Sequence, residues 1–222
     1  MDEPQVDFLQ LADWRRRIAE LYAEVRSLAS DPERAHAGWQ AEREKLYREH
    51  PASPVPGDKR ATFRAVHFPY DSSLRFEVAL IRAPAVDTQS AGATGLGTAA
   101  GLGIQLPMST GQPRAFDRIG WLEIPFAAGP RRLALFWLPE YSGGLFLAFR
   151  DATNDAETYG GGRYLLDTGK GSDLGGNPAG TVVADFNFAY QPSCAFDPRW
   201  SCPLAAPENR LDIEIRAGER IA

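Results

Sequence analysis

Beyond residue 60 the chain repeatedly alternates apolar and polar side chains in short runs that end in Gly, Pro, Asp or Asn. In the clearest run, Leu74, Phe76, Val78 and Leu80 alternate with more polar neighbours. A period of two is typical of a half-buried β-strand, because successive side chains point to opposite faces. Similar runs occur at 61–68, 116–124, 131–138, 144–150, 163–167, 180–186 and 211–216. With few helical spacers between them, these runs predict an antiparallel sandwich, roll or partly open barrel.

The first 50 residues follow a helical period instead. Between 6 and 29, apolar residues such as Ile18 and Val25 recur three or four apart, on the face opposite the run Arg15-Arg16-Arg17. This pattern indicates an amphipathic helix, and we interpret the arginine run as its solvated face.

A second helix follows the first. The residues SDPE at 30–33 offer an N-cap, a proline suited to the first turn and an acid near the positive end of the helix dipole. We expect the helix to pass through Trp39, Leu46 and Tyr47 and to end before Pro51. The predicted class is therefore α+β and mainly β, with two N-terminal helices packed against the β-structure. We expect three parts: a helical segment at 1–50, a proline-rich connector at 51–59 and a β-rich domain at 60–222.

Charge and hydropathy exclude several classes of partner. The 24 basic and 29 acidic residues give a net charge of −5, the wrong sign for an electrostatic hold on nucleic acid or anionic lipid. No stretch reaches the ~20 apolar residues that cross a bilayer, and the start MDEPQVDFLQ is acidic where a signal peptide would be basic. The sequence predicts a cytoplasmic protein that binds neither nucleic acid nor membrane, and it leaves the oligomeric state open.

The chain has two cysteines, Cys194 and Cys202, in one aromatic and proline-rich stretch. They could be buried packing residues, a disulfide, or a metal-binding or reactive pair. The three histidines lie far upstream, so a four-ligand zinc site is disfavoured and we predict no metal.

The loop between Pro84 and Pro107 contains GLGTAAG, which superficially matches a dinucleotide-binding glycine loop. That motif works only between a strand and a helix, whereas prolines and turn residues follow here. We therefore predict a flexible loop and no cofactor.

The stretch FRDATNDAETYGGGRYLLDTGKG, at 149–171, is the richest in polar groups. Its triple glycine lets backbone amides approach a ligand closely, and Tyr159, Arg163 and Lys170 could then bind a carboxylate or phosphate. The alternative is a tight turn between two strands. Asp151 and Asp167, together with Asp185 downstream, could supply acid–base chemistry, although aspartates at strand ends more often accept hydrogen bonds from turn amides.

Several long motifs resemble a known family. They are GGLFLAFRDATNDAETYGGGRYLLDT, KGSDLG, DFNFAYQPSCAFDPRWSCPLAAPENRL and IRAGER, with HPASPV at 50–55 and WLP at 137–139 as earlier landmarks. The chain resembles a bacterial family catalogued as a domain of unknown function, number sixteen eighty-four. The resemblance covers most of the chain and implies no activity. Within it, the loop at 90–103 looks like a local elaboration.

Three hypotheses for function follow. The first is a small anionic-ligand site at one end of the β-domain, with Asp151 or Asp185 as weak candidates for a general base; whether it catalyses a reaction is left open. The second is a noncatalytic interaction module with an exposed apolar patch at Trp39, Trp121 or Trp200. The third is a structural clasp, in which the C-terminal motifs pair with one another and stabilise the fold. The ligand-binding candidates are Arg150, Tyr159, Arg163, Asn187 and Asn209.

Overall fold

The computed structural model describes residues 7–83, 103–139, 143–177 and 179–221. Most of the Ala/Gly-rich loop, including GLGTAAG, lies outside these residues. No helix in the described part of the chain is both long enough and apolar enough to cross a bilayer.

The two predicted helices form as expected. Helix α1 (Phe8–Ser27) begins at Asp7, whose carboxylate accepts the amides of residues 9 and 10, and it buries Ile18, Leu21, Tyr22 and Val25. Helix α2 (Pro32–Glu49) is capped by Asp31 and carries Pro32 in its first turn. Trp39 is fully buried, so it cannot contribute to the exposed apolar patch that an interaction module would need.

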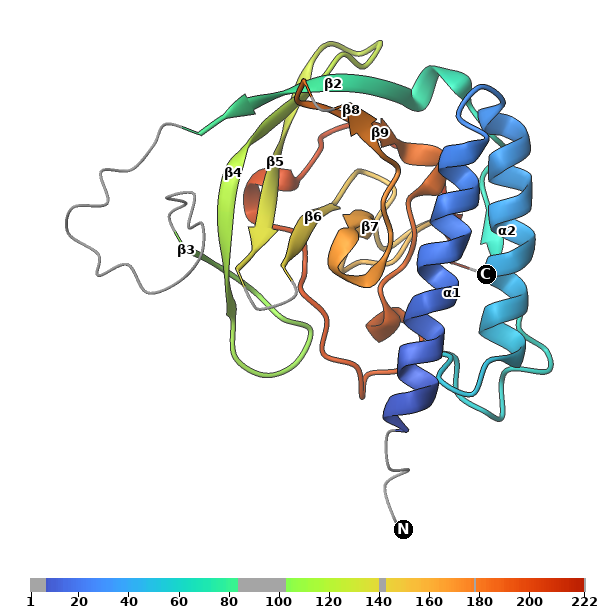
Figure 1. Ribbon diagram of the computed structural model, residues 1–222. Helices are drawn as coiled ribbons and strands as arrows, with labels where there is room; N and C mark the ends of the chain where they lie inside the picture. The colour runs from blue at the N-terminus through green and yellow to red at the C-terminus, as the bar shows by residue number, and fades with distance from the viewer. Residues whose placement is uncertain (1–6, 84–102, 140–142, 178, 222) are drawn as a thin grey trace.

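The strands form a curled, antiparallel half-barrel, and the α+β, mainly β class is confirmed (Figure 1). The order across the sheet is β7-β6-β5-β4-β2-β9-β8, and β3 pairs with β4 beside this path. The two helices lie side by side across the open side of the curl. The strand bounds are β2 (Arg75–Arg82), β3 (Gly103–Leu106), β4 (Arg114–Ile124), β5 (Arg131–Leu138), β6 (Gly144–Phe149), β7 (Arg163–Asp167), β8 (Gly176–Asn177) and β9 (Thr181–Asp185). A separate pair joins β1 (Val66–His67) to β10 (Glu219–Arg220).

Short 3₁₀ turns connect these strands. They are η1 (Ser72–Leu74), η3 (Thr168–Lys170), η4 (Phe186–Phe188), η5 (Ser193–Ala195) and η6 (Pro207–Asn209). At the end of η3, Gly171 has a φ of 94°, and a Cβ there would approach the backbone nitrogen of Ala19 to 2.9 Å. Only a glycine therefore lets α1 pack this closely onto the sheet.

Two expected strands were wrong. In the run at 61–68, only β1 is a strand, and the residues before it form turns and irregular backbone. The run at 211–216 alternates apolar residues but forms no strand. Residues 211 and 213 bond to the backbone of residues 150 and 152, but at Ile215 side chains take over: Asp151 accepts its amide and Arg163 donates to its carbonyl.

Helices and sheet share one continuous core. Side chains from both helices belong to the same buried apolar cluster as those of the central strands. The helix layer is also held by a buried ion pair between Arg43 of α2 and Glu219 of β10. The guanidinium of Arg43 lies over the rings of Tyr47 and Tyr190, with its central carbon 4.6 and 4.4 Å from their centroids.

Candidate functional site

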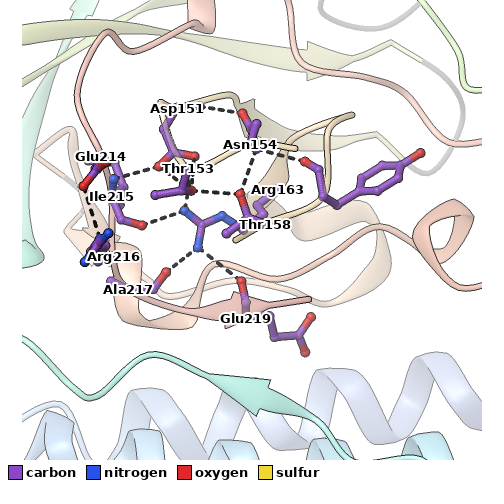
Figure 2. Close-up of polar contacts among 11 residues, drawn as sticks. Asp151, Thr153, Asn154, Thr158, Arg163, Glu214, Ile215, Arg216, Ala217 and Glu219 are labelled. Carbon is purple, nitrogen blue, oxygen red and sulfur yellow. Dashed lines mark hydrogen bonds and ion pairs between the residues drawn. The ribbon is translucent and has the colours of Figure 1, made fainter. Parts of the chain in front are cut away.

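Arg163, at the start of β7, is the centre of a buried polar network (Figure 2). Its side chain is fully buried and donates to three backbone carbonyls of the C-terminal segment. The acceptors are Ile215 at 2.8 Å, Glu219 at 3.2 Å and Ala217. These carbonyls belong to alternate residues, so the guanidinium fork occupies the place that an adjacent strand's amides would otherwise fill.

Asp151 completes this network from the end of β6. Its Oδ1 lies 3.4 Å from Nη2 of Arg163, its Oδ2 accepts the amide of Ile215 at 2.7 Å, and the hydroxyl of Thr153 donates to it. Burial lowers the pKa of Arg163, and the Asp151 carboxylate opposes that shift. Each charge faces the other and fixed protein groups, although Nε of Arg163 is buried without a hydrogen-bond partner. We name this set, Asp151, Thr153, Arg163 and the carbonyls of 215, 217 and 219, the clasp.

Asn209 makes a second internal bridge. Its Oδ1 accepts the amide of Ala134 in β5 at 2.7 Å, and its Nδ2 donates to the carbonyls of Ala134 and of Ala148 in β6, both at 2.9 Å. These contacts tie two central strands together.

Asp185 and Asn187 meet where β9 ends. Asn187 donates to Oδ1 of Asp185 from both its backbone and its side chain, and it also binds the backbone of Asp71. Oδ2 of Asp185 is buried without a hydrogen-bond partner, and Nε of Arg75 lies 3.6 Å away. Burial raises the pKa of Asp185 to about 6. The neighbouring cavity has about 20 Å³, which suffices for a water molecule.

The two remaining candidates lie nearer the surface. Nη2 of Arg150 is 3.6 Å from the exposed carboxylate of Asp155. The hydroxyl of Tyr159 lies 3.8 Å from the sulfur of Cys194, and burial raises the tyrosine's pKa to about 12. The structure thus joins Asp151 with Arg163 and Asp185 with Asn187. Ligand binding or catalysis by any of these candidates stays a prediction.

A cavity of about 210 Å³ opens at the other end of β7. Most of its wall is apolar and includes Phe116 of β4 and Phe146 of β6, whose ring centroids are 5.2 Å apart. The charged residues that line it are Arg114, Asp167 and Lys170. Nζ of Lys170 lies 3.5 Å from Oδ2 of Asp167, and the lysine side chain is 52% exposed. We name this the rim cavity.

A smaller cavity of about 50 Å³ shares Asp167 and Lys170 with the rim cavity and extends beneath the helices. Arg43 and Cys202 also line it. The sequence reasoning missed Arg43, yet a signal was present: it stands four residues from both Trp39 and Tyr47 on the apolar face of α2. The apolar wall of the rim cavity had no comparable local signal, because its residues come from separate strands.

A larger hollow, about 520 Å³, lies between the start of α1 and the end of α2. Arg17, Glu42, Lys45 and Glu49 are among its lining residues, so long charged side chains of both signs form much of its wall. Such chains move readily in solvent, and we therefore favour the rim cavity, whose walls are core side chains. In the described part of the chain, no three His, Cys, Asp or Glu side chains converge in a way that could hold a metal ion.

Comparisons with known proteins agree on fold and family and add no activity. The chain is similar to an uncharacterized protein of Haloarcula marismortui whose structure was determined by solution NMR. The two are 27% identical, with a TM-score of 0.58, over 87% of this chain and 96% of that one. No curated protein matched the sequence. The family model described as "Protein of unknown function (DUF1684)" matches residues 61–220, and the chain therefore belongs to the DUF1684 family.

Proposed function

We propose that the protein binds a small organic acid with an apolar body in the rim cavity. The observation that carries this proposal is the position of two cations, Arg114 and Lys170, on a cavity that is otherwise walled mainly by apolar side chains. Ligand sites commonly combine apolar walls with a few placed polar groups. The proposal includes no reaction, and catalysis stays open.

Charge favours an acid over a base as the ligand. Arg114 and Lys170 bring two cationic side chains to the lining, beside the carboxylate of Asp167. The ammonium of Lys170 is half-exposed and its ion pair with Asp167 is at 3.5 Å, so it can turn towards a bound carboxylate at little cost.

The apolar wall selects the rest of the ligand. Phe146 packs edge-on against Tyr164 at 4.9 Å between centroids, and Phe116 is 1% exposed, so both rings are held by the core. A preformed apolar surface of this kind binds without paying to order flexible side chains. The volume of about 210 Å³ fits a small molecule and excludes a folded partner.

The test compares hexanoate with hexanamide, which has the same chain without the charge, by thermal shift and calorimetry. We expect hexanoate to stabilise the full chain and hexanamide to do so less. Lys170→Gln should abolish the preference for the acid. Lys45→Gln is the matched control, because Lys45 is also half-exposed and pairs with an acid three residues before it.

Two results would contradict the proposal. Equal binding of acid and amide would show that the cations do not contribute. Equal loss of binding in Lys170→Gln and Lys45→Gln would show that any effect arises from overall charge and not from the rim cavity.

The clasp favours a second candidate, a noncatalytic module whose C-terminal motifs stabilise the fold. All three carbonyls bound by Arg163 and both carboxylate oxygens of Asp151 have protein partners. In this second case the motifs maintain the structure and the rim cavity stays empty in solution. Calorimetry with hexanoate distinguishes the two candidate functions, because only a ligand-binding rim cavity gives a heat of binding that Lys170→Gln reduces.

We further propose a cytoplasmic location and no nucleic-acid or membrane partner. The two buried free thiols fit a reducing compartment, where lasting disulfides are uncommon. The net charge of −5 disfavours binding to polyanions.

A further inference from the structure

The two cysteines lie next to each other although seven residues separate them in the chain. Cys194 is in η5, and its backbone amide donates to the sulfur of Cys202 at 3.3 Å. The two thiols are close enough to shift each other's pKa, and both are free. The loop between them therefore already brings its ends together, so joining the sulfurs requires little further loss of chain entropy.

Neighbouring elements hold this loop in place. The backbones of Ser109 and Cys202 bond at 2.8 Å, and the amide of Cys202 donates to the Ser109 hydroxyl at 2.9 Å. Within the loop, the ring of Phe196 packs edge-on against Tyr47 of α2, with centroids 5.1 Å apart. The approach of the two thiols is thus fixed by contacts with both the sheet and the helix layer.

The two sulfurs differ in environment. Cys194 is 9% exposed and Cys202 only 3%. The neighbouring thiol of Cys202 and the hydroxyl of Tyr159, 3.8 Å from the sulfur, lower the pKa of Cys194. The thiol of Cys194 and then burial raise the pKa of Cys202. The titratable groups Lys170, Tyr47, Tyr159 and Tyr164 also act on Cys202. Its greater exposure and its lowered pKa favour Cys194 as the more reactive thiol of the pair.

We propose that Cys194 and Cys202 form a reversible dithiol–disulfide site, in which Cys194 reacts first with a hydroperoxide and Cys202 resolves the product. The thiolate of Cys194 attacks the outer peroxide oxygen, the O–O bond breaks, and an alcohol or water leaves after taking up a proton. This step oxidises Cys194 to a sulfenic acid. The sulfur of Cys202 then attacks the Cys194 sulfur, and its proton leaves with the hydroxyl as water. Two external thiols restore the reduced pair by exchange and leave as a disulfide.

This site is separate in chemistry from the proposed ligand binding but lies beside it. Cys202 lines the smaller cavity, and its neighbours Ser201 and Pro203 line the rim cavity. The disulfide would close a covalent ring around residues 194–202 without requiring the rim cavity to bind anything. Failure of hexanoate binding thus leaves this proposal intact.

The test uses the full chain and limiting hydrogen peroxide, followed by intact mass spectrometry. Because the chain has only two cysteines, a loss of two thiols can be assigned to Cys194 and Cys202. We expect the wild type to lose the mass of two hydrogen atoms and both titratable thiols, and to recover them with dithiothreitol. In Cys202→Ser the reaction should stop at the sulfenic acid, which dimedone traps. Cys194→Ser should react many-fold more slowly and give no dimedone adduct.

Three outcomes would overturn the proposal. The native protein could retain both thiols under conditions that oxidise the unfolded chain, or its product could be an intermolecular dimer alone. Dimedone could also label the two single variants equally. A measurement on the wild type avoids any folding defect of the variants. Iodoacetamide should label Cys194 before Cys202, with a pH midpoint below the value of about 8.5 for an ordinary thiol. Labelling of Cys202 before Cys194 by iodoacetamide would also overturn the proposal.

Discussion

The two ends of β7 use similar charged residues in opposite ways. At its start, Arg163 is fully buried and engages three carbonyls and a carboxylate. Past its other end, Lys170 is half-exposed and faces one carboxylate beside a cavity. A guanidinium presents a rigid fork of donors that can satisfy several fixed acceptors, whereas an ammonium on a flexible stem is a mobile point charge. The buried end therefore holds segments of the fold together, and the open end is the one that we propose as the ligand site.

The largest expected effect is at the clasp. Arg163→Met should lower the free energy of unfolding by about 3–5 kcal/mol, because it leaves the buried Asp151 carboxylate without its cation and removes the guanidinium donors from three buried carbonyls. Urea unfolding followed by circular dichroism measures this loss.

Arg150→Met is the matched control. Arg150 is close in sequence but pairs with the exposed Asp155, whose side chain is 77% accessible, so a loss of about 1 kcal/mol or less is expected. Equal losses of unfolding free energy in the two variants would contradict this prediction, because burial of the guanidinium would then not explain the loss in Arg163→Met.

An intermediate effect is expected at Asp185, which is buried like the clasp but has one oxygen without a hydrogen-bond partner. Its folded pKa of about 6 lies above the ~3.9 of an unfolded aspartate, so the folded state binds this proton more tightly. The resulting contribution to stability is full below pH ~4 and is lost as the pH rises through about 6.

Asp185→Asn removes this contribution. Between pH ~4 and ~7 the wild type should therefore lose on the order of 1–2 kcal/mol relative to the variant. Paired urea titrations across that range give the difference. A difference that does not change with pH would mean that Asp185 is ionised in the folded protein across the whole range.

The smallest effect on stability is expected at the rim cavity. Lys170→Gln should change the free energy of unfolding by less than about 1 kcal/mol, because the ammonium is half-exposed and lies 3.5 Å from a largely buried carboxylate. The same urea experiment measures it. A loss as large as that of Arg163→Met would show that both ends of β7 are structural and would leave the second candidate function as the better one.

Much of the fold followed from local patterns. The spacing of apolar residues and, for the second helix, the cap signal at 30–33 placed both helices within about two residues of their observed ends, because periodicity and start signals are contained in the segment itself. The strand expected at 131–138 has those bounds. The strand expected at 211–216 was wrong because some of its backbone groups bond to the side chains of Asp151 and Arg163, which lie far away in sequence.

The candidate site was less predictable. The sequence named Arg163, Asp151, Lys170 and Asp167 from one polar stretch, but it could not say which of them would be buried. Strand β7 separates these residues into two pairs at its opposite ends. No local pattern in the sequence predicted the apolar wall of the rim cavity or the pairing of Arg43 with Glu219.

The sequence by itself thus determined the class, the two helices, most strands and the family to which the chain belongs, since these depend on periodicity, caps and long motifs. Only the tertiary structure decided the environment of each polar group: that Arg163 is enclosed, that Lys170 stands at a cavity and that Cys194 meets Cys202. The physical reason is that the state of a charge or thiol depends on which distant segments surround it, and that is settled by how the whole sheet curls and packs.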